Sequence, residues 1–416
     1  MAKVPMALAK DGGKKVRTRP WPAEAKRFGA PELKQLKEAL DQNTLFYTRG
    51  KKTEQLYEKM RALTGARHVV ACSSGSAAIH GALKAAGIGP GDEVITTPIT
   101  DAGTILWIVY EGAIPVFADV DPETWAVTLA TVAAKITPRT RAVIAVHLMG
   151  NPLDMRGLTA LCRKRNLKLI EDCAQAWGAK LAGKSVGTFG DFGCFSLNDF
   201  KHIGAGDGGL IIAKKEEDWR RAWFAIDKCY DRITGKRALE FVAPNYRITE
   251  LQSAVAIAQM DRLPGIVEPR NRLGGRLAAG VRKIPGFYPV KSLANSFPTW
   301  WFFLIGIDRD KIAAPTAEIV EMLAAEGIGG LGVGYVNPPV HIAYPYLAKR
   351  QAFAHSKHPF DLYKTAPRYA KGDCPVAERV AGDCIQFFMK EWLTDREIDD
   401  ALAALAKVGA HCVKTA

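Results

Sequence analysis

Short apolar runs alternate with amphipathic segments along the first half of the chain. Predicted strands cover residues 69–72, 92–97, 114–120, 141–147, 167–171, 194–197 and 209–213. Predicted helices cover residues 77–86, 102–111 and 158–165, and residues 31–61 are helical around a polar loop. Strands that alternate with helices of this length fold into a parallel or mixed sheet with helices on both faces. The pattern therefore predicts an α/β fold.

The pattern changes after residue 247, where longer helical segments take over. Helices are predicted over residues 249–262, 264–281, 314–325 and 395–407, and a strand over residues 300–307. Domains average about 150 residues, so 416 residues suggest two or three of them. We expect an N-terminal extension (1–30), a large domain (31–265) and a small C-terminal domain (266–416).

Composition places the chain among ordinary globular proteins, with 48% hydrophobic and 24% charged residues. No apolar run approaches the roughly 18 residues of a membrane helix. The eight cysteines form no C-x-x-C pair and mostly lie in apolar runs, which indicates free buried thiols and no cysteine zinc site. No long apolar region followed by a cleavage site opens the chain. We expect a cytoplasmic protein without a membrane partner or a metal.

The net charge of +14 raises the alternative of a nucleic-acid binder. However, the basic residues are dense only between residues 10 and 19, and no zinc-finger spacing or aromatic RNA-binding run accompanies them. Scattered cations of this kind are usually a solvated surface. We expect no nucleic-acid partner, although the same charge would attract a small anionic substrate.

The first candidate motif is the small-residue turn after the first predicted strand, Ser73-Ser74-Gly75-Ser76-Ala77-Ala78. A helix that starts here exposes free backbone N–H groups and its positive dipole end, which together can hold a phosphate. A simple serine cap explains the same residues equally well. No P-loop lysine follows this turn, and the turn itself has no G-x-G-x-x-G motif, so nucleotide-binding classes are disfavoured.

Two further motifs follow predicted strands. Asp172 and Gln175 follow an apolar strand, and ligands of α/β sheets bind beyond such strand ends. Lys201 lies between another strand and a glycine-rich loop, where partial burial would lower its pKa and favour imine chemistry. Taken singly, Asp172 could be a structural cap or salt-bridge partner, and Lys201 an ordinary surface lysine.

Together the three motifs fit the needs of pyridoxal 5′-phosphate (PLP). The turn would anchor the phosphate, Asp172 would keep the pyridine nitrogen protonated, and Lys201 would carry the aldehyde as an imine and move a proton. The lysine follows the carboxylate by about 30 residues. This combination is more specific than any one motif.

The chain resembles the DegT/DnrJ/EryC1/StrS family of fold-type-I PLP enzymes, mostly sugar and aminocyclitol aminotransferases. Residues 74–78 match the family, and so do six further stretches, each followed here by the number of its first residue: GIGPGDEVITTP (87), GAIPVFADVDPETW (112), ITPRTRAVIAVHLMGNPLDM (136), LIEDCAQAWGA (169), VGTFGDFGCFSLNDFKHIGAGDGG (186) and PNYRITELQSAVAIAQM (244). The resemblance covers roughly residues 10–410. It implies a large domain with a mixed, mostly parallel seven-stranded sheet flanked by helices, and a smaller C-terminal α+β domain.

The resemblance also implies roles for individual residues. Lys201 is the implied catalytic residue. The implied cofactor-binding residues are Gly75, Ser76, Ala77, Asp172, Gln175, Ser196 and, from the partner subunit, Asn245. Residues that could contact substrate are Asp101, His202, Tyr335 and His341. A residue contributed by the neighbouring subunit implies a homodimer with a composite active site.

Asp101 departs from the family pattern, because it occupies the place where an aromatic ring usually stacks on the pyridine. An acid there could alter donor choice, bind an amino group on the substrate, or leave another residue to cover the ring. A second departure is Pro244, before Asn245. The segment Val16–Trp21 and the residues around Tyr335 and His341 are most similar to the branch containing scyllo-inosose and aminohydroxybenzoate enzymes.

The implied activity is transfer of an amino group from L-Glu or L-Gln to a keto group of a sugar, nucleotide sugar or cyclitol. Such enzymes serve secondary-metabolite, antibiotic or surface-glycan biosynthesis. One alternative is a non-transaminating PLP enzyme such as a sugar dehydratase, in which a histidine typically replaces the lysine. Another is a PLP-binding regulatory protein without turnover. The sequence leaves open the donor, the acceptor, the stereochemistry and the pathway.

Overall fold

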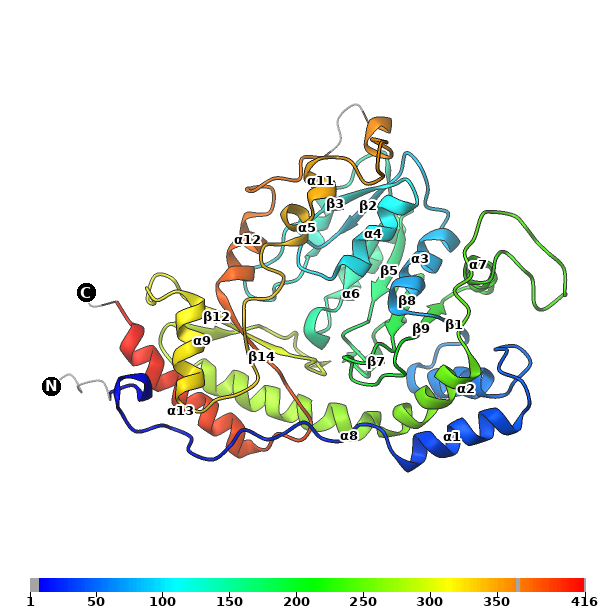
Figure 1. Cartoon of the computed structure of the whole chain (residues 1–416). Coiled ribbons are helices and arrows are strands. Elements are labelled where there is room, and N and C mark those ends of the chain that lie inside the picture. Colours follow the sequence, from blue (N-terminus) through cyan, green and yellow to red (C-terminus); the bar gives the residue numbers. More distant parts are fainter. Residues whose placement is uncertain (1–6, 364–366, 415–416) are drawn as a thin grey trace.

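A seven-stranded sheet forms the centre of the computed structural model, which describes residues 7–363 and 367–414 (Figure 1). In spatial order the strands are β1 (His68–Cys72), β9 (Gly209–Ala213), β8 (Phe192–Ser196), β5 (Lys168–Asp172), β4 (Thr140–Val146), β2 (Glu93–Thr96) and β3 (Ile114–Phe117). Strand β9 pairs antiparallel with both of its neighbours, and the other pairs in the sheet are parallel. The predicted α/β fold with a mixed, mostly parallel sheet is confirmed.

Helices cover both faces of this sheet, which explains why its strands are continuous apolar runs. One face packs against α3 (Gly75–Ala85), α4 (Ala102–Tyr110) and α7 (Glu216–Ile226). The other face packs against α2 (Lys52–Thr64), α6 (Met155–Lys164) and α8 (Glu250–Val281). Alternate residues of β1 reach opposite cores, because successive side chains of a strand point to opposite faces.

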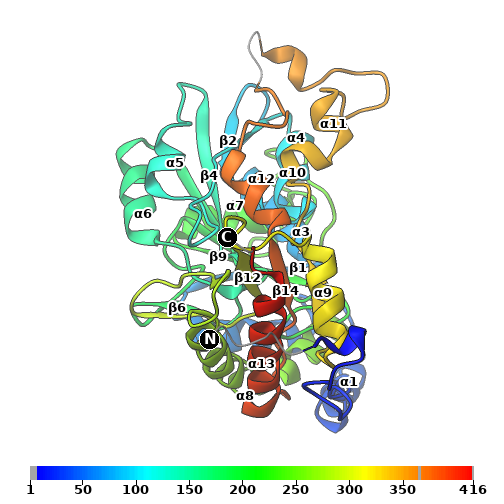
Figure 2. The same cartoon turned by 90° about the vertical axis from the view of Figure 1, so that its left-hand side faces the viewer.

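A second, four-stranded antiparallel sheet lies in the C-terminal half of the chain. Its order is β10 (Phe287–Pro289), β12 (Phe303–Ile307), β14 (Cys384–Phe387) and β13 (Leu331–Val333). Helices α8, α9 (Thr316–Ala325) and α13 (Asp395–Cys412) pack around it, as Figure 2 shows from the side. This matches the predicted smaller α+β part.

Helix α8 corrects one prediction. The sequence predicts two helices separated at Leu263, but the structure has one helix of 32 residues with Pro264 and Pro269 inside it. Each proline removes a helical hydrogen bond, yet α8 packs along its length on α1 (Ala30–Asp41) and α2 at one end and on β10 and α13 at the other. Those tertiary contacts offset the local cost. The domain boundary predicted after residue 265 falls within this helix.

The N-terminal segment lies beside α9 and α13 in the C-terminal half (Figure 1). The buried Arg17 guanidinium binds Glu397 and Asp400 of α13 at 3.0 and 2.7 Å. The ammonium of Lys407 lies 2.8 Å from the carboxylate of Glu326, which also accepts the backbone N–H of Ala9 and Val16. The predicted extension is therefore anchored by ion pairs, and its first six residues lie outside the described part.

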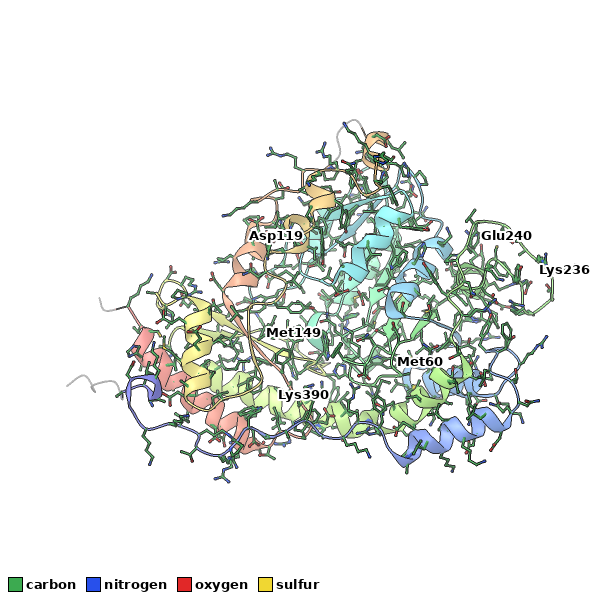
Figure 3. All side chains as sticks on the ribbon, in the orientation of Figure 1. Met60, Asp119, Met149, Lys236, Glu240 and Lys390 are labelled. Carbon is green, nitrogen blue, oxygen red and sulfur yellow. The ribbon has the colours of Figure 1, made fainter. Side chains whose placement is uncertain are left out.

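Shorter elements complete the chain. They are α5 (Leu129–Ala133), α10 (Val340–Ala343), α11 (Pro345–Ala348), α12 (Pro375–Gly382), the strands β6 (Lys180–Leu181), β7 (Lys184–Ser185) and β11 (Ser296–Phe297), and the 3-10 turns η1 (Ala9–Asp11), η2 (Leu148–Gly150) and η3 (Phe360–Leu362). Figure 3 shows Met60 and Met149 inside the molecule and Lys236 and Glu240 on a projecting loop. All eight cysteines are free and buried, as predicted. No helix in the described ranges is long and apolar enough to cross a membrane.

Candidate active site

The candidate active site is a cavity of about 390 Å³ at the carboxyl ends of the central strands. The chain leaves β1 into the turn before α3, β2 into the loop before α4, and β5 and β8 into the loops that carry Asp172 and Lys201. The predicted site residues that line the cavity are Gly75, Ser76, Asp101, Asp172, Gln175, Ser196 and Lys201. The fold thus brings together three motifs that lie far apart in the sequence.

The start of α3 forms one wall of this cavity. The Ser74 hydroxyl accepts a hydrogen bond from the N–H of Ala77 at 3.0 Å and so caps the helix. A Cβ on Gly75 would lie 2.6 Å from Cβ of Ser196, so only glycine allows β8 to end this close to the helix. The predicted serine cap and the predicted phosphate site, called the cradle below and formed by the turn of residues 73–78, are both compatible with this geometry. The first N–H groups of a helix lack partners within it.

Asp172 closes the bottom of the cavity at the end of β5. Its Oδ2 accepts the Thr104 hydroxyl at 2.8 Å, and its Oδ1 accepts the N–H of Ala174 at 3.0 Å. Burial raises the pKa of the Asp172 carboxyl, while these two hydrogen bonds and the charge of Lys201 act in the opposite direction. The two donors fix the orientation of the carboxylate, and a cationic N–H group above it would stabilise its charged form.

Lys201 lies opposite, between β8 and the glycine-rich loop. Its Nζ is 3.7 Å from the centroid of the Trp301 ring, and the indole N–H of Trp301 donates to the carbonyl of Phe200 at 2.6 Å. Burial lowers the pKa of the Lys201 ammonium, and the carboxylates of Asp172 and Asp101 raise it. A lowered pKa increases the fraction of free amine, which is the nucleophile toward an aldehyde or ketone.

Gln175 connects the cavity to the C-terminal half of the chain. Its Oε1 accepts the N–H of Met149 at 2.7 Å, and its Nε2 donates to the Tyr335 hydroxyl at 3.0 Å. Tyr335, which the sequence assigns to substrate binding, does not line the cavity and reaches it through Gln175. The hydrogen bonds hold the Gln175 amide in one orientation.

Four other predicted site residues do not line this cavity: Ala77, His202, Asn245 and His341. His202 is buried and its Nε2–H donates to the carbonyl of Thr299 at 3.1 Å. His341 pairs with Glu378 at 3.0 Å and lines a separate cavity of about 190 Å³. Their roles in substrate binding stay predictions.

Asn245 lies in a strand-like segment next to the start of the cradle. It forms an isolated β-bridge with Asp227, and the following carbonyl, of Tyr246, accepts the N–H of Ser73 at 2.7 Å. Its side-chain oxygen accepts the N–H of Arg247 at 3.4 Å. The backbone next to Asn245 therefore contacts the cradle loop, but the Asn245 side chain does not line the cavity of its own chain.

Asp101, at the place of the expected aromatic ring, is the N-cap of α4. Its Oδ1 accepts the N–H of Gly103 at 2.8 Å, and its carboxylate is exposed in the cavity. Thr104, Phe200, Asp207 and Trp301 also line the cavity and were not predicted from the sequence. The aromatic run Trp300–Phe303 was a visible signal for Trp301, whereas nothing in the sequence distinguishes Thr104 from other helix residues.

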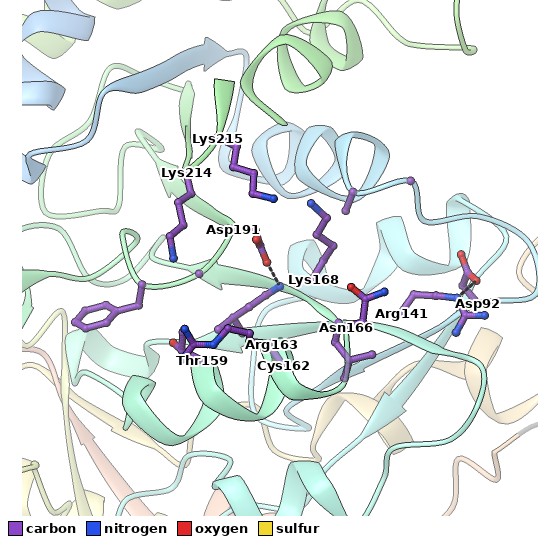
Figure 4. Close-up of a pocket in the computed structure, with 16 residues that line it drawn as sticks. Asp92, Arg141, Thr159, Cys162, Arg163, Asn166, Lys168, Asp191, Lys214 and Lys215 are labelled. Carbon is purple, nitrogen blue, oxygen red and sulfur yellow. Dashed lines mark hydrogen bonds and ion pairs between the residues drawn. The ribbon is translucent and has the colours of Figure 1, made fainter. Parts of the chain in front are cut away.

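A second cavity, of about 630 Å³, opens at the opposite edge of the same sheet (Figure 4). Its charged lining residues are Asp92, Arg141, Arg163, Lys168, Asp191, Lys214 and Lys215. Burial raises the pKa of the Cys162 thiol to about 12, so this thiol stays protonated at neutral pH. Lys168 pairs with the buried Asp218 at 2.9 Å, and Lys214 and Lys215 are exposed. Burial lowers the pKa of Lys201 in the other cavity, so the candidate active site is the cavity at the carboxyl edge.

His147, Glu171 and Cys173 also lie close together, with ligand atoms within 4.8 Å of one another. His147 accepts the N–H of Leu153 and pairs with Glu171 at 3.0 Å. Glu171 further accepts three backbone N–H groups, from Gly187, Phe189 and Gly190. These hydrogen bonds occupy both ring nitrogens of His147 and both carboxylate oxygens of Glu171, the atoms that would otherwise bind a metal. The cluster therefore holds the loop before β8 in place and is structural.

Known proteins resemble this chain over most of its length. The family model for the DegT/DnrJ/EryC1/StrS aminotransferase family matches residues 27–406. A candidate L-glutamine:3-amino-2,3-dideoxy-scyllo-inosose aminotransferase of Micromonospora echinospora is 32% identical over 426 aligned positions, which cover 96% of each chain. The UDP-N-acetyl-3-dehydro-α-D-glucosamine 3-aminotransferase of Acidithiobacillus ferrooxidans is 36% identical over 352 positions, covering 84% of this chain and 86% of that protein.

The fold has solved counterparts as well. The aminotransferase from Psychrobacter cryohalolentis superposes with a TM-score of 0.80 at 30% identity, covering 95% of this chain and 99% of that one. Similarity of this extent includes both sheets and the elements that carry the cavity.

Proposed function

The chain belongs to the DegT/DnrJ/EryC1/StrS aminotransferase family, and from that premise we propose that it transfers an amino group from L-Glu or L-Gln to a ketone of a sugar, nucleotide sugar or cyclitol. The donor carbon becomes a ketone and the acceptor carbonyl carbon becomes an amine-bearing carbon, so amine and carbonyl exchange without an external oxidant. One observation carries the proposal: a partly buried lysine and a buried aspartate share a cavity with the start of a helix.

We propose PLP as the cofactor, and the residues of the cavity fit it. The start of α3 and the hydroxyls of Ser76 and Ser196 offer donors to a phosphate, and the side-chain-free Gly75 keeps these groups together. Asp172 offers an oriented carboxylate to a ring nitrogen, and Gln175 offers an amide to a ring hydroxyl. When bound, PLP supplies an aldehyde and a ring that withdraws electrons from the reacting carbon.

The protein side of the chemistry follows from the environments of Lys201 and Asp172. Because burial lowers its pKa, Lys201 offers a free amine as a nucleophile and can then take a proton from one carbon and return it to another. Asp172 stabilises a proton on the ring nitrogen through its negative charge. The N–H of Ala77 already donates to the Ser74 hydroxyl, so its part in the cradle is to orient the turn.

We propose that the active unit is a homodimer in which the partner subunit's Asn245 completes the site. Two features support this. The Asn245 side chain does not line its own cavity, and large apolar side chains are exposed close by, Phe200 at 78% and Val242 at 88%. Exposed apolar groups of this size commonly mark protein contacts. Consistent with the cysteine pattern, we place the enzyme in the cytoplasm.

The test is reconstitution of the purified protein with PLP. Wild type is expected to gain visible absorbance, to lose it with L-Glu or L-Gln, and to show a PLP-sized mass addition on the Lys201 peptide after borohydride reduction. Lys201→Ala should lose the adduct and turnover, by about 10³-fold or more. Lys164→Ala, at an exposed position outside the cavity, is the matched control. An adduct on another lysine, or turnover by Lys201→Ala, would refute the assignment.

A further inference from the structure

The charge of the candidate active site is opposite to the charge of the protein. The chain carries a net charge of +14, yet the cavity is lined by three carboxylates, Asp101, Asp172 and Asp207. Lys201 is the one cation among its described lining residues. The cationic side chains gather instead at other places, including the cavity at the opposite edge of the sheet (Figure 4).

None of the three carboxylates forms an ion pair in the described part of the chain. Lys201 interacts with both Asp172 and Asp101 at longer range, through their charges. Asp101 and Asp207 are exposed and line the cavity. Among the described residues, the Asp207 carboxylate accepts a hydrogen bond only from the N–H of Gly208, at 2.8 Å, while its backbone carbonyl accepts one from Nε2 of Gln252 at 3.1 Å. Both carboxylates therefore keep negative charge available toward the cavity.

Asp101 points one oxygen at its own helix and leaves the other free. Its Oδ1 accepts the N–H of Gly103, and no hydrogen bond is recorded at Oδ2 among the described residues. Asp101 lines the cavity together with Lys201. Burial lowers the pKa of Lys201 and raises the pKa of the Tyr344 hydroxyl, and the negative charge of Asp101 acts in the raising direction on both. Capping does not require this charge, since asparagine caps helices as well as aspartate does.

A bound cofactor would add further negative charge to the cavity. Its phosphate would lie near Ser76 and Ser196, and its ring nitrogen would pair with Asp172. A nucleotide-linked acceptor carries negatively charged phosphates. Asp101 and Asp207 would repel these phosphates at the cavity. An acceptor with an ammonium group would find opposite charge.

We propose, on the basis of the proposed function, that the acceptor ketone already carries an amine and that Asp101 binds this ammonium group. The substrate class is therefore an amino-keto-cyclitol or a free amino-keto sugar rather than a nucleotide-linked sugar. Asp207 adds to the negative potential from the opposite loop. Asp101 acts as a specificity residue at the position that the family gives to an aromatic ring.

The experiment compares three acceptors with the PLP-loaded enzyme in its amine-bearing form. They are 3-amino-2,3-dideoxy-scyllo-inosose, 2-deoxy-scyllo-inosose with a hydroxyl in place of that amine, and UDP-N-acetyl-3-dehydro-α-D-glucosamine. Wild type should prefer the first in kcat/KM. Asp101→Asn, which keeps the helix cap, should lower kcat/KM for the first acceptor by about 10- to 100-fold, mainly through KM. In Asp101→Asn, the ratio of kcat/KM for the amine-bearing acceptor to kcat/KM for the hydroxyl acceptor should fall by the same factor.

Asp154→Asn is the matched control, because Asp154 caps α6 through the N–H of Arg156 and does not line the cavity. This variant should retain the wild-type preference. An independent measurement uses wild type alone: KM for the amine-bearing acceptor should rise with salt, whereas KM for the hydroxyl acceptor should not.

The outcomes separate this inference from the proposed function. If L-Gln and L-Glu leave the absorbance of bound PLP unchanged, the aminotransferase proposal fails and the inference with it. If the donors react but wild type prefers the uncharged or the UDP-linked acceptor, the inference alone is overturned. An equal loss with all three acceptors in Asp101→Asn would also overturn it.

Discussion

The ammonium of Lys201 lies 3.7 Å from the centroid of the Trp301 ring. The lysine lies between β8 and β9 of the central sheet, whereas the tryptophan precedes β12 of the second sheet. The reactive amine is therefore held between the two halves of the chain. The ring favours the charged amine through its π electrons, while the burial to which it contributes favours the neutral amine.

Replacing Trp301 tests which effect dominates. Because burial is the largest cause of the lowered pKa, Trp301→Ala should admit water and raise the pKa of Lys201. Trp301→Phe keeps a ring and should change it less. The measurement is the pH dependence of Lys201 acetylation in the cofactor-free protein, followed by mass spectrometry. A lower pKa in Trp301→Ala would mean that the cation–π contact outweighs burial.

The hydroxyl of Thr104 should tune Asp172. Thr104→Val removes its hydrogen bond to Asp172, so the pKa of that carboxyl should rise further and the acid limb of kcat/KM should move to higher pH. We expect PLP to bind about 10-fold more weakly. Thr100→Val is the control, since Thr100 contacts Thr104 at 2.6 Å but not Asp172. Equal effects of the two variants would point to general loss of packing.

Gly75 should be required for the cradle and Gly89 should not. A Cβ at Gly75 would lie 2.6 Å from Cβ of Ser196, whereas a Cβ at Gly89 meets nothing within 4 Å. Gly75→Ala is expected to weaken PLP binding by about 10-fold or more, because the helix start and β8 must separate. Gly89→Ala should bind normally. Titration of PLP by fluorescence quenching distinguishes the two, and normal binding by Gly75→Ala contradicts the assigned cradle.

Two neighbouring glycines of α8 should respond in opposite ways. At Gly275 an added Cβ meets open space, so Gly275→Ala should raise the free energy of unfolding by about 0.5–1 kcal/mol. At Gly274 it would overlap the Trp300 ring, so Gly274→Ala should lower it by about 1–3 kcal/mol. Urea unfolding at equal protein concentration gives both values. The same sign for both variants would contradict this packing.

Buried His202 should make the fold sensitive to acid. Burial lowers its pKa well below the usual 6.5, so below about pH 6.5 the unfolded chain takes up a proton that the folded chain does not. This contribution to stability is present above pH 6.5 and is lost as the pH falls, at up to about 1.4 kcal/mol per pH unit. His202→Gln should reduce that slope, and exposed His355→Gln should not. Parallel slopes in urea unfolding between pH 5 and 7 would reject this role.

The sequence was sufficient for the central sheet because its signals are local. Runs such as Val69–Cys72 and Ile114–Phe117 are buried on both faces and stand between clear turns, so their strands are evident. The prolines of α8 indicate a break that the structure does not have, since the contacts that keep this helix continuous come from distant parts of the chain. β10 and β13 were not predicted because strands of three residues carry little periodicity, and β14 was not predicted because it follows α12 with one residue between them, without a turn motif to mark its start.

The residues of the candidate site also fall into two groups, those that local sequence motifs predict and those that depend on packing between distant segments. Gly75, Asp172 and Lys201 follow strands and could be placed from motifs, whereas Trp301 enters the cavity from the C-terminal half and depends on how the sheets pack. His341 looked similar to a site residue, yet Glu378 holds it in another cavity. Contacts between remote segments are what a motif does not encode.

The continuous helix α8 limits how far the two sheets can move relative to each other. At about 1.5 Å per residue it forms a rod of roughly 48 Å that is fastened to α1 and α2 at one end and to β10 and α13 at the other. A swing of one sheet against the other would have to bend this rod, and its two prolines mark where it would yield. We therefore expect substrate entry to be governed by surface loops, such as the one carrying Phe200, while the scaffold beneath stays fixed.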